Sequence, residues 1–375
     1  MSVALAETSR PSLPAGASAE LVAFRDLAGW QVDDHAAAFA TFLVSCRRTP
    51  SLREATPAPV ALGAACEIAL KLAAGGTPSS DTARRFFEQH FRSFHIRPTT
   101  GRGFTTGYFE PEFDGARARS DAYPVPVYRR PADLVTKMSG DHWPGLDPAL
   151  SSARKTASGL EAYPDRSAID AGLLAGLGLE VLWMRDEVDR FVMQVQGSGR
   201  IRLADGTTVR LVYAGRNGLP YTSLGRVLSQ RENSPPAEMT MDRLVARLKA
   251  DKDFARKLIA ENRSFVFFDE APKLSQTAGP IGGAGISLTP FRSIAADRTI
   301  WAYGLPAWLS GELPLSAGGT EPLQRLAIIQ DTGSAIVGPA RIDVFLGSGP
   351  EAGHRAGLVR HPLDFTILWP KVPTP

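Results

Sequence analysis

Apolar residues at the start of the chain repeat at the spacing of a helix. One predicted helix face carries apolar residues at i, i+3, i+4 and i+7, namely Phe39, Phe42, Leu43 and Cys46. A second apolar helix is expected over 60–74. A third is expected from a cap at Ser80, with an apolar stripe that runs on to Phe94. We therefore expect the first hundred residues to be helical.

From Gly101 onward the pattern changes to short apolar runs. Prolines alternate with apolar residues over 123–128 (YPVPVY), which is typical of an edge strand because proline cannot donate to a β-ladder. The sequence ADG at 204–206 separates two alternating runs and predicts a hairpin. Further β runs are expected over 180–184, 190–196, 264–268, 326–330 and 341–346. One helix interrupts them, marked by Met241, Leu244, Val245 and Leu248.

Composition narrows the classes of protein. A length of 375 residues suggests two or three domains, and 35 glycines with 29 prolines indicate many turns, hence a β-rich body. The net charge of +3 does not favour a dedicated nucleic-acid binder. No apolar run approaches the roughly 20 residues of a membrane helix. Residues 3–6 (VALA) fit the end of a signal peptide or a free cytosolic N-terminus, and both interpretations stay open.

Cysteine and histidine usage gives no sign of a metal site or a cofactor. The two cysteines, Cys46 and Cys66, exclude a four-cysteine zinc site and are compatible with two buried thiols or one disulfide. The six histidines are scattered, without a His-Glu-x-x-His motif, and we expect neither metal nor cofactor. The glycine-rich run 279–285 lacks the Lys-Ser/Thr of a phosphate-binding loop.

Two carboxylates remain as candidate chemistry. Asp331 begins an Asp-Thr-Gly sequence like that of aspartic proteases, but a second such sequence is missing, so a protease would have to be a dimer. Asp343 follows twelve residues later. If 338–340 forms a hairpin turn, Asp331 lies opposite Gly347 and Asp343 opposite Ala335, and the carboxylates approach only across a curved barrel. The structural alternative is that Asp331 orders the turn and Asp343 is a solvated strand residue.

A series of motifs makes the chain resemble a known family. In chain order these motifs are GYFEP at 107–111, QVQGSG at 194–199, YAGRNG at 213–218, SFVFF at 264–268, ADR at 296–298, QDTGSAI at 330–336, and Asp343 with GPEAGHRAG at 349–357. Together they resemble the membrane-bound lytic murein transglycosylase A (MltA) family. The C-terminal part resembles the family's module named for three aspartates, which would be Asp297, Asp331 and Asp343.

The resemblance implies a mainly β fold with N-terminal helices and two domains. A double-psi β-barrel catalytic domain would be built from residues 1–106 and 236–375. An inserted β-barrel domain, residues 107–235, would form the other wall of a groove for glycan.

The implied activity is cleavage of the β-1,4 bond between N-acetylmuramic acid and N-acetylglucosamine in peptidoglycan, which leaves a 1,6-anhydromuramyl end. Asp343 would be the acid and then the base, because the sugar's C6 hydroxyl replaces the second carboxylate of ordinary glycosidases. An acid that works near neutral pH needs a pKa raised by burial or by a like charge such as Asp331. Asp331 would also stabilise the transition state, and Asp297 would hold the barrel loops.

Further residues in the matching motifs are expected to assist. Candidate glycan contacts are Tyr108, Gln196, Ser198 and Tyr213, with barrel packing as the alternative for each. His354 and Arg355 are expected either to hydrogen-bond an aspartate or the glycan, or to clamp a loop. Ser334 and Val337 depart from the glycine and lysine common in relatives.

The resemblance further implies a monomer that acts on peptidoglycan strands in the cell envelope, as a periplasmic or outer-membrane-associated protein. A non-catalytic peptidoglycan-binding module is the main alternative, and a dimeric aspartic protease is a weaker one.

Overall fold

The chain folds into two compact units. The computed structural model describes residues 10–48, 60–99, 101–138, 140–235, 238–271 and 278–372. One unit comprises Met1–Phe109, Gln276–Gly347 and His354–Pro375, and the other comprises Glu110–Ser275 and Ser348–Gly353. Residues 3–6, which the sequence leaves open as a signal segment, lie outside the described residues. Among the helices described, each falls short of the length and apolarity that a bilayer span requires.

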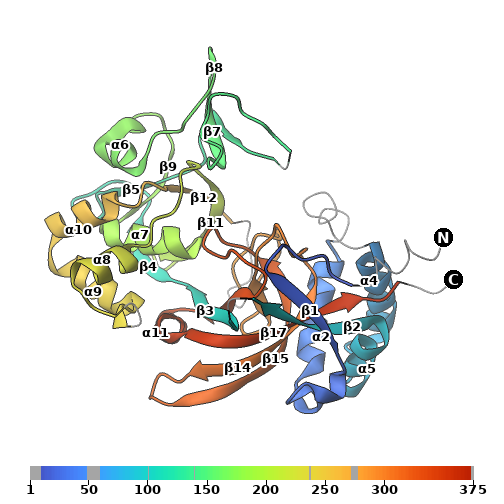
Figure 1. Cartoon of the computed structure of the whole chain (residues 1–375). Helices are drawn as coiled ribbons and strands as arrows, with labels where there is room; N and C mark the ends of the chain where they lie inside the picture. Colours follow the sequence, from blue (N-terminus) through green and yellow to red (C-terminus); the bar gives the residue numbers. More distant parts are fainter. Residues whose placement is uncertain are drawn as a thin grey trace. The chain divides into compact units, whose positions relative to one another are not determined.

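The first unit is built on a closed β-barrel (Figure 1). Six strands form the ring in the order β17 (Arg360–Pro370), β14 (Pro306–Pro314), β15 (Thr320–Asp331), β13 (Ser293–Ala295), β16 (Arg341–Ser348) and β3 (Gly103–Glu110). Pairing of β3 with β17 closes the ring, and only β13–β15 is parallel among the registers described around it. The predicted mainly β fold class with a barrel is thereby confirmed.

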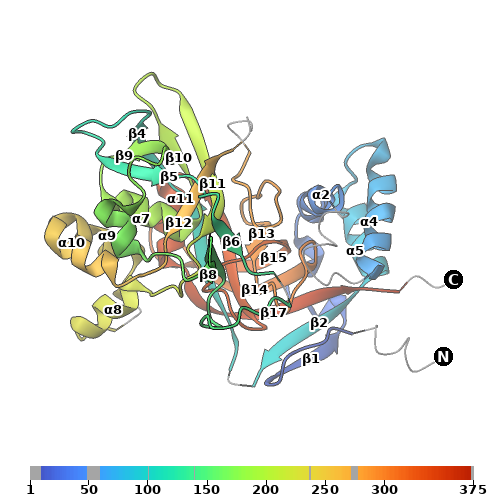
Figure 2. The same ribbon diagram turned by 90° about the horizontal axis from the view of Figure 1, so that it is seen from above.

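Helices accompany the barrel at the N-terminal end of the chain (Figure 2). They are α2 (His35–Cys46), α4 (Val60–Leu72) and α5 (Ser80–His90), with short 3-10 turns at Phe24–Asp26, Trp30–Val32 and Ala73–Gly75. Asp34 and Ser79 cap α2 and α5, since their side chains accept hydrogen bonds from the first-turn N–H groups. The phenylalanines of α2 and α5 pack in one aromatic cluster in the core.

The expectation that the first hundred residues are entirely helical is wrong. Strands β1 (Ala17–Val22) and β2 (Phe91–Pro98) pair antiparallel, and β2 also pairs with β17 of the barrel. The apolar stripe predicted for the third helix includes Phe91 and Phe94, but α5 ends at His90 and both phenylalanines lie on β2. Local periodicity is ambiguous where a helix leads directly into a strand. The backbone hydrogen bonds of β2 with β17 therefore determine the conformation of residues 91–96.

A buried ion pair joins the segment before α2 to the barrel. Two Arg292 nitrogens donate to the two oxygens of Asp33, at 2.7 and 2.9 Å. Asp33 also accepts the N–H of Leu326 on β15 at 2.9 Å. The pair is almost completely buried, and its bidentate geometry with the extra donor satisfies the carboxylate.

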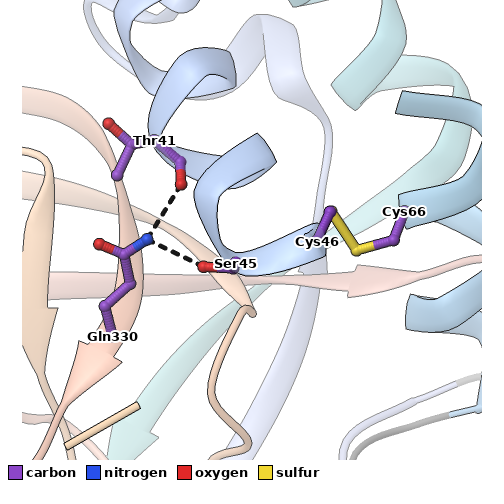
Figure 3. Close-up of a disulfide and its surroundings, with 5 residues drawn as sticks. All are labelled: Thr41, Ser45, Cys46, Cys66 and Gln330. Carbon is purple, nitrogen blue, oxygen red and sulfur yellow. Dashed lines mark hydrogen bonds between the residues drawn. A yellow bond between two sulfur atoms is a disulfide. The ribbon is translucent and has the colours of Figure 1, made fainter. Parts of the chain in front are cut away.

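A disulfide ties the first two helices together (Figure 3). Cys46, the last residue of α2, is bonded to Cys66 in α4, and both residues are buried. The structure thus favours the disulfide over two buried thiols. In the same turn of α2, Thr41 and Ser45 face Gln330 of β15, so the disulfide anchors a helix that contacts the barrel directly.

The second unit contains a curved six-stranded sheet. Its order is β12 (Val266–Glu270), β11 (Thr208–Arg216), β10 (Ser198–Arg202), β4 (Glu112–Ala116), β9 (Glu180–Met184) and β5 (Val125–Tyr128). The outermost strands β12 and β5 also contact each other, so the sheet curls round on itself. The predicted hairpin is confirmed as β10–β11, and the predicted edge strand is β5. A smaller sheet contains β6 (Leu134–Thr136), β7 (Ser152–Thr156) and β8 (Gly159–Glu161).

Helices of the second unit share one apolar cluster. They are α7 (Glu187–Gln196), α8 (Leu224–Arg231), α9 (Met241–Ala250) and α10 (Lys252–Ala260), while a short α6 (Arg166–Ala168) leads into a π-turn at Ile169–Leu173. The strand predicted over 190–196 is wrong, because this segment is α7. Asp186 caps its N-terminus, and Gly197 ends it in the left-handed conformation at φ 79°.

The second unit continues beyond the predicted end of the inserted domain at residue 235. Strand β12 forms an antiparallel ladder with β11, from Val266–Arg216 to Glu270–Leu211. Helices α9 and α10 pack with α7 and α8 in the same apolar cluster. Ladder and packing together assign residues up to Ser275 to this unit.

The disulfide predicts a measurable loss of stability on its removal. The double variant Cys46→Ala, Cys66→Ala is expected to lose about 3 kcal/mol of unfolding free energy, because a cross-link over 20 residues restricts the unfolded chain. Urea unfolding of both proteins measures this difference. Dithiothreitol should lower the midpoint of the wild type toward that of the variant and leave the variant unchanged. Equal midpoints without reductant would contradict the prediction.

Candidate active site

The two candidate aspartates lie in one row of the barrel. Strand β13 lies between β15 and β16, and Ala295 on β13 pairs with Asp331 on one side and Asp343 on the other. Because paired residues project to the same face of a sheet, both carboxylates point the same way, across one small alanine. The predicted hairpin pairing of Asp331 with Gly347 and of Asp343 with Ala335 is wrong, since β13 separates the two strands.

A β-bulge on β15 sets this row. Ile294 pairs with Ile329, but the next pair is Ala295 with Asp331, so Gln330 is the extra residue. A shift of one residue reverses the side on which each following side chain projects, so the bulge decides which face Asp331 occupies.

The side chain of the bulged residue is fully buried and firmly held. Gln330 Oε1 accepts the hydroxyl of Ser293 at 2.5 Å. Its Nε2 donates to the Thr41 carbonyl at 2.9 Å and to the Ser45 hydroxyl at 2.8 Å, both on α2 (Figure 3). The helix next to the disulfide therefore fixes the residue immediately before Asp331.

Asp331 is surrounded by hydrogen-bond donors. The Tyr108 hydroxyl donates to Oδ2 at 2.8 Å, and the backbone N–H groups of Gly283 and Thr332 donate to Oδ1 at 2.7 and 2.8 Å. Burial and the Asp331 charge raise the pKa of Tyr108 well above its usual value, so the phenol keeps its proton and acts as a donor. Three donors favour the carboxylate form of Asp331.

The glycine-rich run 279–285 supplies one of these donors. A Cβ added to Gly283 would lie 2.5 Å from the Tyr303 hydroxyl and 3.2 Å from Asp331 Oδ1, so only glycine lets this backbone approach the carboxylate. The loop is further fixed by the Ala284 N–H, which donates to the Gln330 carbonyl at 3.1 Å. The sequence showed the run, but its role becomes visible only once the loop is seen against Asp331.

Asp343 has a different environment. The Thr106 hydroxyl on β3 donates to Oδ1 at 2.7 Å. Arg341 Nη2 in turn donates to the Thr106 oxygen at 2.7 Å. Ala295, the middle residue of the row, belongs to an apolar cluster with Tyr108 and Phe345, and Asp343 is only partly exposed.

The two carboxylates consequently differ in their readiness to hold a proton. Burial raises the pKa of Asp343 to about 6, with a small further increase from Asp331, while Arg341 and the Thr106 hydrogen bond act in the opposite direction. Burial also raises the pKa of Asp331, but its three donors oppose that shift. The pair therefore combines a carboxyl that can carry a proton near pH 6 with an acceptor that is already hydrogen-bonded.

The remaining predicted residues of the first unit have structural contacts. Asp297 is buried and accepts the Thr299 N–H and hydroxyl at 2.9 and 2.6 Å and the Gly338 N–H at 2.8 Å, so it ties two barrel loops together. Arg355 donates to the Pro314 carbonyl at 3.2 Å and pairs with Glu321, both at the β14–β15 hairpin. His354 precedes it on α11 (Pro350–Leu358) and is exposed.

The predicted glycan contacts are divided between the units. Tyr108 lies on β3 in the first unit and bonds Asp331, as described above. In the second unit, Gln196 ends α7, Ser198 is buried at the start of β10, and Tyr213 on β11 is 52% exposed.

Several residues at the site have roles that the sequence alone does not reveal. Thr106, Arg341, Gln330 and Gly283 touch or position the aspartates, yet each is an ordinary strand or loop residue by local pattern. Within the residues that the structure describes, no three or more His, Cys, Asp or Glu side chains group as metal ligands.

Fold and site together define a class: a closed β-barrel with two partly buried aspartates in one strand row. Comparisons with known proteins narrow the class to a family. The profile of the MltA specific insert domain matches residues 104–269, and that of the 3D domain matches residues 292–369.

A crystal structure of membrane-bound lytic murein transglycosylase from Agrobacterium tumefaciens superposes with a TM-score of 0.82. It has 37% sequence identity, over 94% of this chain and 98% of that one. Escherichia coli MltA with bound chitohexaose superposes with a TM-score of 0.67 at 25% identity, over 96% of each chain. The chain therefore belongs to the family of membrane-bound lytic murein transglycosylase A.

Curated relatives agree with this assignment. The Vibrio cholerae membrane-bound lytic murein transglycosylase A is 34% identical over 270 residues, which are 70% of this chain and 64% of the relative. The chain thus matches somewhat less than two thirds of the length of that relative.

The raised pKa of Asp343 predicts how stability depends on pH. The unfolded chain gives up this proton near pH 4, but the folded chain keeps it to about pH 6, so stability falls as pH rises through that window. Asp343→Asn should therefore be more stable than wild type at pH 8, by about 1–2 kcal/mol after discounting for partial exposure, and nearly equal at pH 4. Urea unfolding at both pH values measures the difference.

Asp297→Asn is the matched control. The Asp297 carboxylate accepts three hydrogen bonds, so this substitution should lower the stability of the protein at pH 8. If Asp343→Asn also loses stability at pH 8, burial does not penalise its charge.

Proposed function

We propose that this protein is a lytic transglycosylase, which cleaves the β-1,4 bond between N-acetylmuramic acid and N-acetylglucosamine in peptidoglycan and leaves a 1,6-anhydromuramyl end. The observation that carries the proposal is the row Asp331–Ala295–Asp343, in which Asp331 accepts three hydrogen bonds and burial raises the pKa of Asp343 to about 6. Membership of the family and the chitohexaose bound to the Escherichia coli relative support a glycan substrate.

Asp343 is the acid and then the base in this proposal. Its proton passes to the glycosidic oxygen, the bond from that oxygen to C1 of the muramyl sugar breaks, and positive charge develops on C1 and the ring oxygen. The C6 hydroxyl of the same sugar then bonds to C1 and returns its proton to Asp343. No water is consumed, so one carboxyl completes the cycle where hydrolysis uses two.

Asp331 stabilises the developing positive charge. Its three hydrogen bonds favour the carboxylate form against the burial that raises its pKa, and electrostatic interactions in a partly buried site are stronger than in water. Asp297 supports the loops and takes no part in proton transfer, in agreement with its three donors.

The remaining expectations belong to the same proposal. In the inserted unit Gln196 and Tyr213 contact glycan, and Tyr213 has the exposure that stacking on a sugar requires. Ser198 is buried, which favours barrel packing for this residue. The names of its relatives support action on murein in the cell envelope. In this proposal the protein is a monomer.

The test is a digest of purified peptidoglycan with wild type and with Asp343→Asn. We expect wild type to release fragments one water lighter than hydrolysis products and the variant to be slower by about 10²–10⁴-fold. Mass spectrometry of the soluble fragments measures both. Urea unfolding of the variant shows that it is folded.

Two results would contradict the proposal. Products with reducing ends would mean that water, not the C6 hydroxyl, attacks C1. Binding of folded wild type to peptidoglycan without any soluble product would favour the non-catalytic binding module.

Removal of the Asp331 charge is expected to shift the pH profile of kcat/KM. The acid must be protonated, so kcat/KM should fall as pH rises through about 6. Asp331→Asn removes a like charge, lowers the pKa of Asp343, and should move this alkaline limb downward by on the order of 0.5 pH unit, with a lower kcat. Rates of anhydro-product release between pH 4 and 8 test this. An upward shift would show that the Asp331 charge does not act on Asp343.

A further inference from the structure

The hydroxyl of Thr106 and the guanidinium of Arg341 form a directed chain of hydrogen bonds that ends on Asp343. Arg341 Nη2 lies 2.7 Å from Thr106 Oγ1, and Thr106 Oγ1 lies 2.7 Å from Asp343 Oδ1. The three residues come from two strands that are neighbours in the barrel order, β16 and β3.

The direction of this chain follows from the chemistry of its members. A guanidinium has donors and no acceptor, so Thr106 must accept from Arg341. A threonine hydroxyl has one hydrogen, and among the described contacts of Thr106 the acceptor for it is Asp343 Oδ1. Oδ1 consequently accepts a hydrogen bond, and the carboxyl proton of neutral Asp343 belongs on Oδ2.

Arg341 is itself held in place. It donates to the carbonyl of Ile342 and lies over the Phe104 ring, with the guanidinium carbon 5.4 Å from the ring centroid. Both contacts restrict the side chain, so the donor that orients Thr106 is fixed before any substrate is present.

We propose that Thr106, oriented by Arg341, is a positioning residue that fixes the Asp343 carboxyl and confines its transferable proton to Oδ2. This rests on the proposed function of Asp343 as the acid. One oxygen is occupied by the threonine, and the other both gives the proton to the glycosidic oxygen and receives it from the C6 hydroxyl. No rotation of the carboxyl is needed between the two half-reactions.

The test compares Thr106→Val, which keeps the branched shape and loses the hydroxyl, with Thr106→Ser, which keeps the hydroxyl. For Thr106→Val we expect kcat to fall about tenfold with KM changed less than twofold. The alkaline limb of kcat/KM should move upward by on the order of 0.5–1 pH unit, because a donor to the carboxylate is lost. Thr106→Ser should restore both within about threefold, as a single hydrogen bond requires.

Thr105→Val is the matched control. It removes the neighbouring hydroxyl of the same strand, which donates to the Thr106 carbonyl at 3.2 Å, and should leave the pH profile unchanged. If Thr106→Val does not fold, Thr106→Ala makes the same test at this partly exposed position. An unshifted profile in a folded hydroxyl-free variant, or equal defects in the valine and serine variants, would overturn the proposal.

A second readout separates this inference from the proposed function. The single variant Thr106→Val is compared with the double variant that also carries Asp343→Asn. The difference between their free energies of unfolding, measured from pH 4 to 8, reports the pKa of Asp343 without any substrate. An upward shift there, with no anhydro product from wild type, would leave the coupling of Thr106 to Asp343 standing and remove the transglycosylase function. No shift there would remove the coupling, whatever the activity.

Discussion

The site depends on one irregularity in the barrel, the bulge at Gln330. Strand β15 runs parallel to β13, and without the extra residue Asp331 would lie opposite Ala296 and project on the other face from Ala295 and Asp343. The bulge leaves a buried amide that must find hydrogen-bond partners, and it finds them in Ser293 and in α2. The N-terminal helix is thereby part of the structure that places a carboxylate beside Asp343.

The same reasoning explains why the disulfide lies where it does. Thr41 and Ser45 bond Gln330 from the turn that ends in Cys46, so fraying at this end of α2 would release the amide (Figure 3). Helix ends are the least stable parts of helices because their last carbonyls lack partners within the helix. The covalent link to α4 stabilises that end.

The strands and the acidic residues were predicted from different features of the sequence. Alternation and apolar runs located β16, β9 and the β10–β11 hairpin, because these strands carry local signals. They failed at β2, where Phe91 and Phe94 fit the apolar stripe of a helix. They also failed at α7, where residues 190–196 fit a strand; tertiary packing determines the conformation at both places. The aspartates came from the family resemblance, since spacing alone favoured a structural role. The row through Ala295 could not be predicted, because parallel pairing of β13 with β15 joins residues about 35 positions apart, for which no local signal exists.

One pair of carboxylates shows how identical side chains acquire different protonation states. Both lie in one row and both are partly buried, and burial is the largest cause that raises the pKa of each. The difference comes from donors: Asp331 receives a phenol and two backbone N–H groups, whereas Thr106 reaches only Oδ1 of Asp343. One of the two backbone donors, the Gly283 N–H, depends on the close approach of the glycine loop, and the Gln330 carbonyl anchors that loop through the Ala284 N–H. The bulge therefore determines both where Asp331 points and how strongly it is held as an anion. That anion in turn favours the proton on its neighbour Asp343.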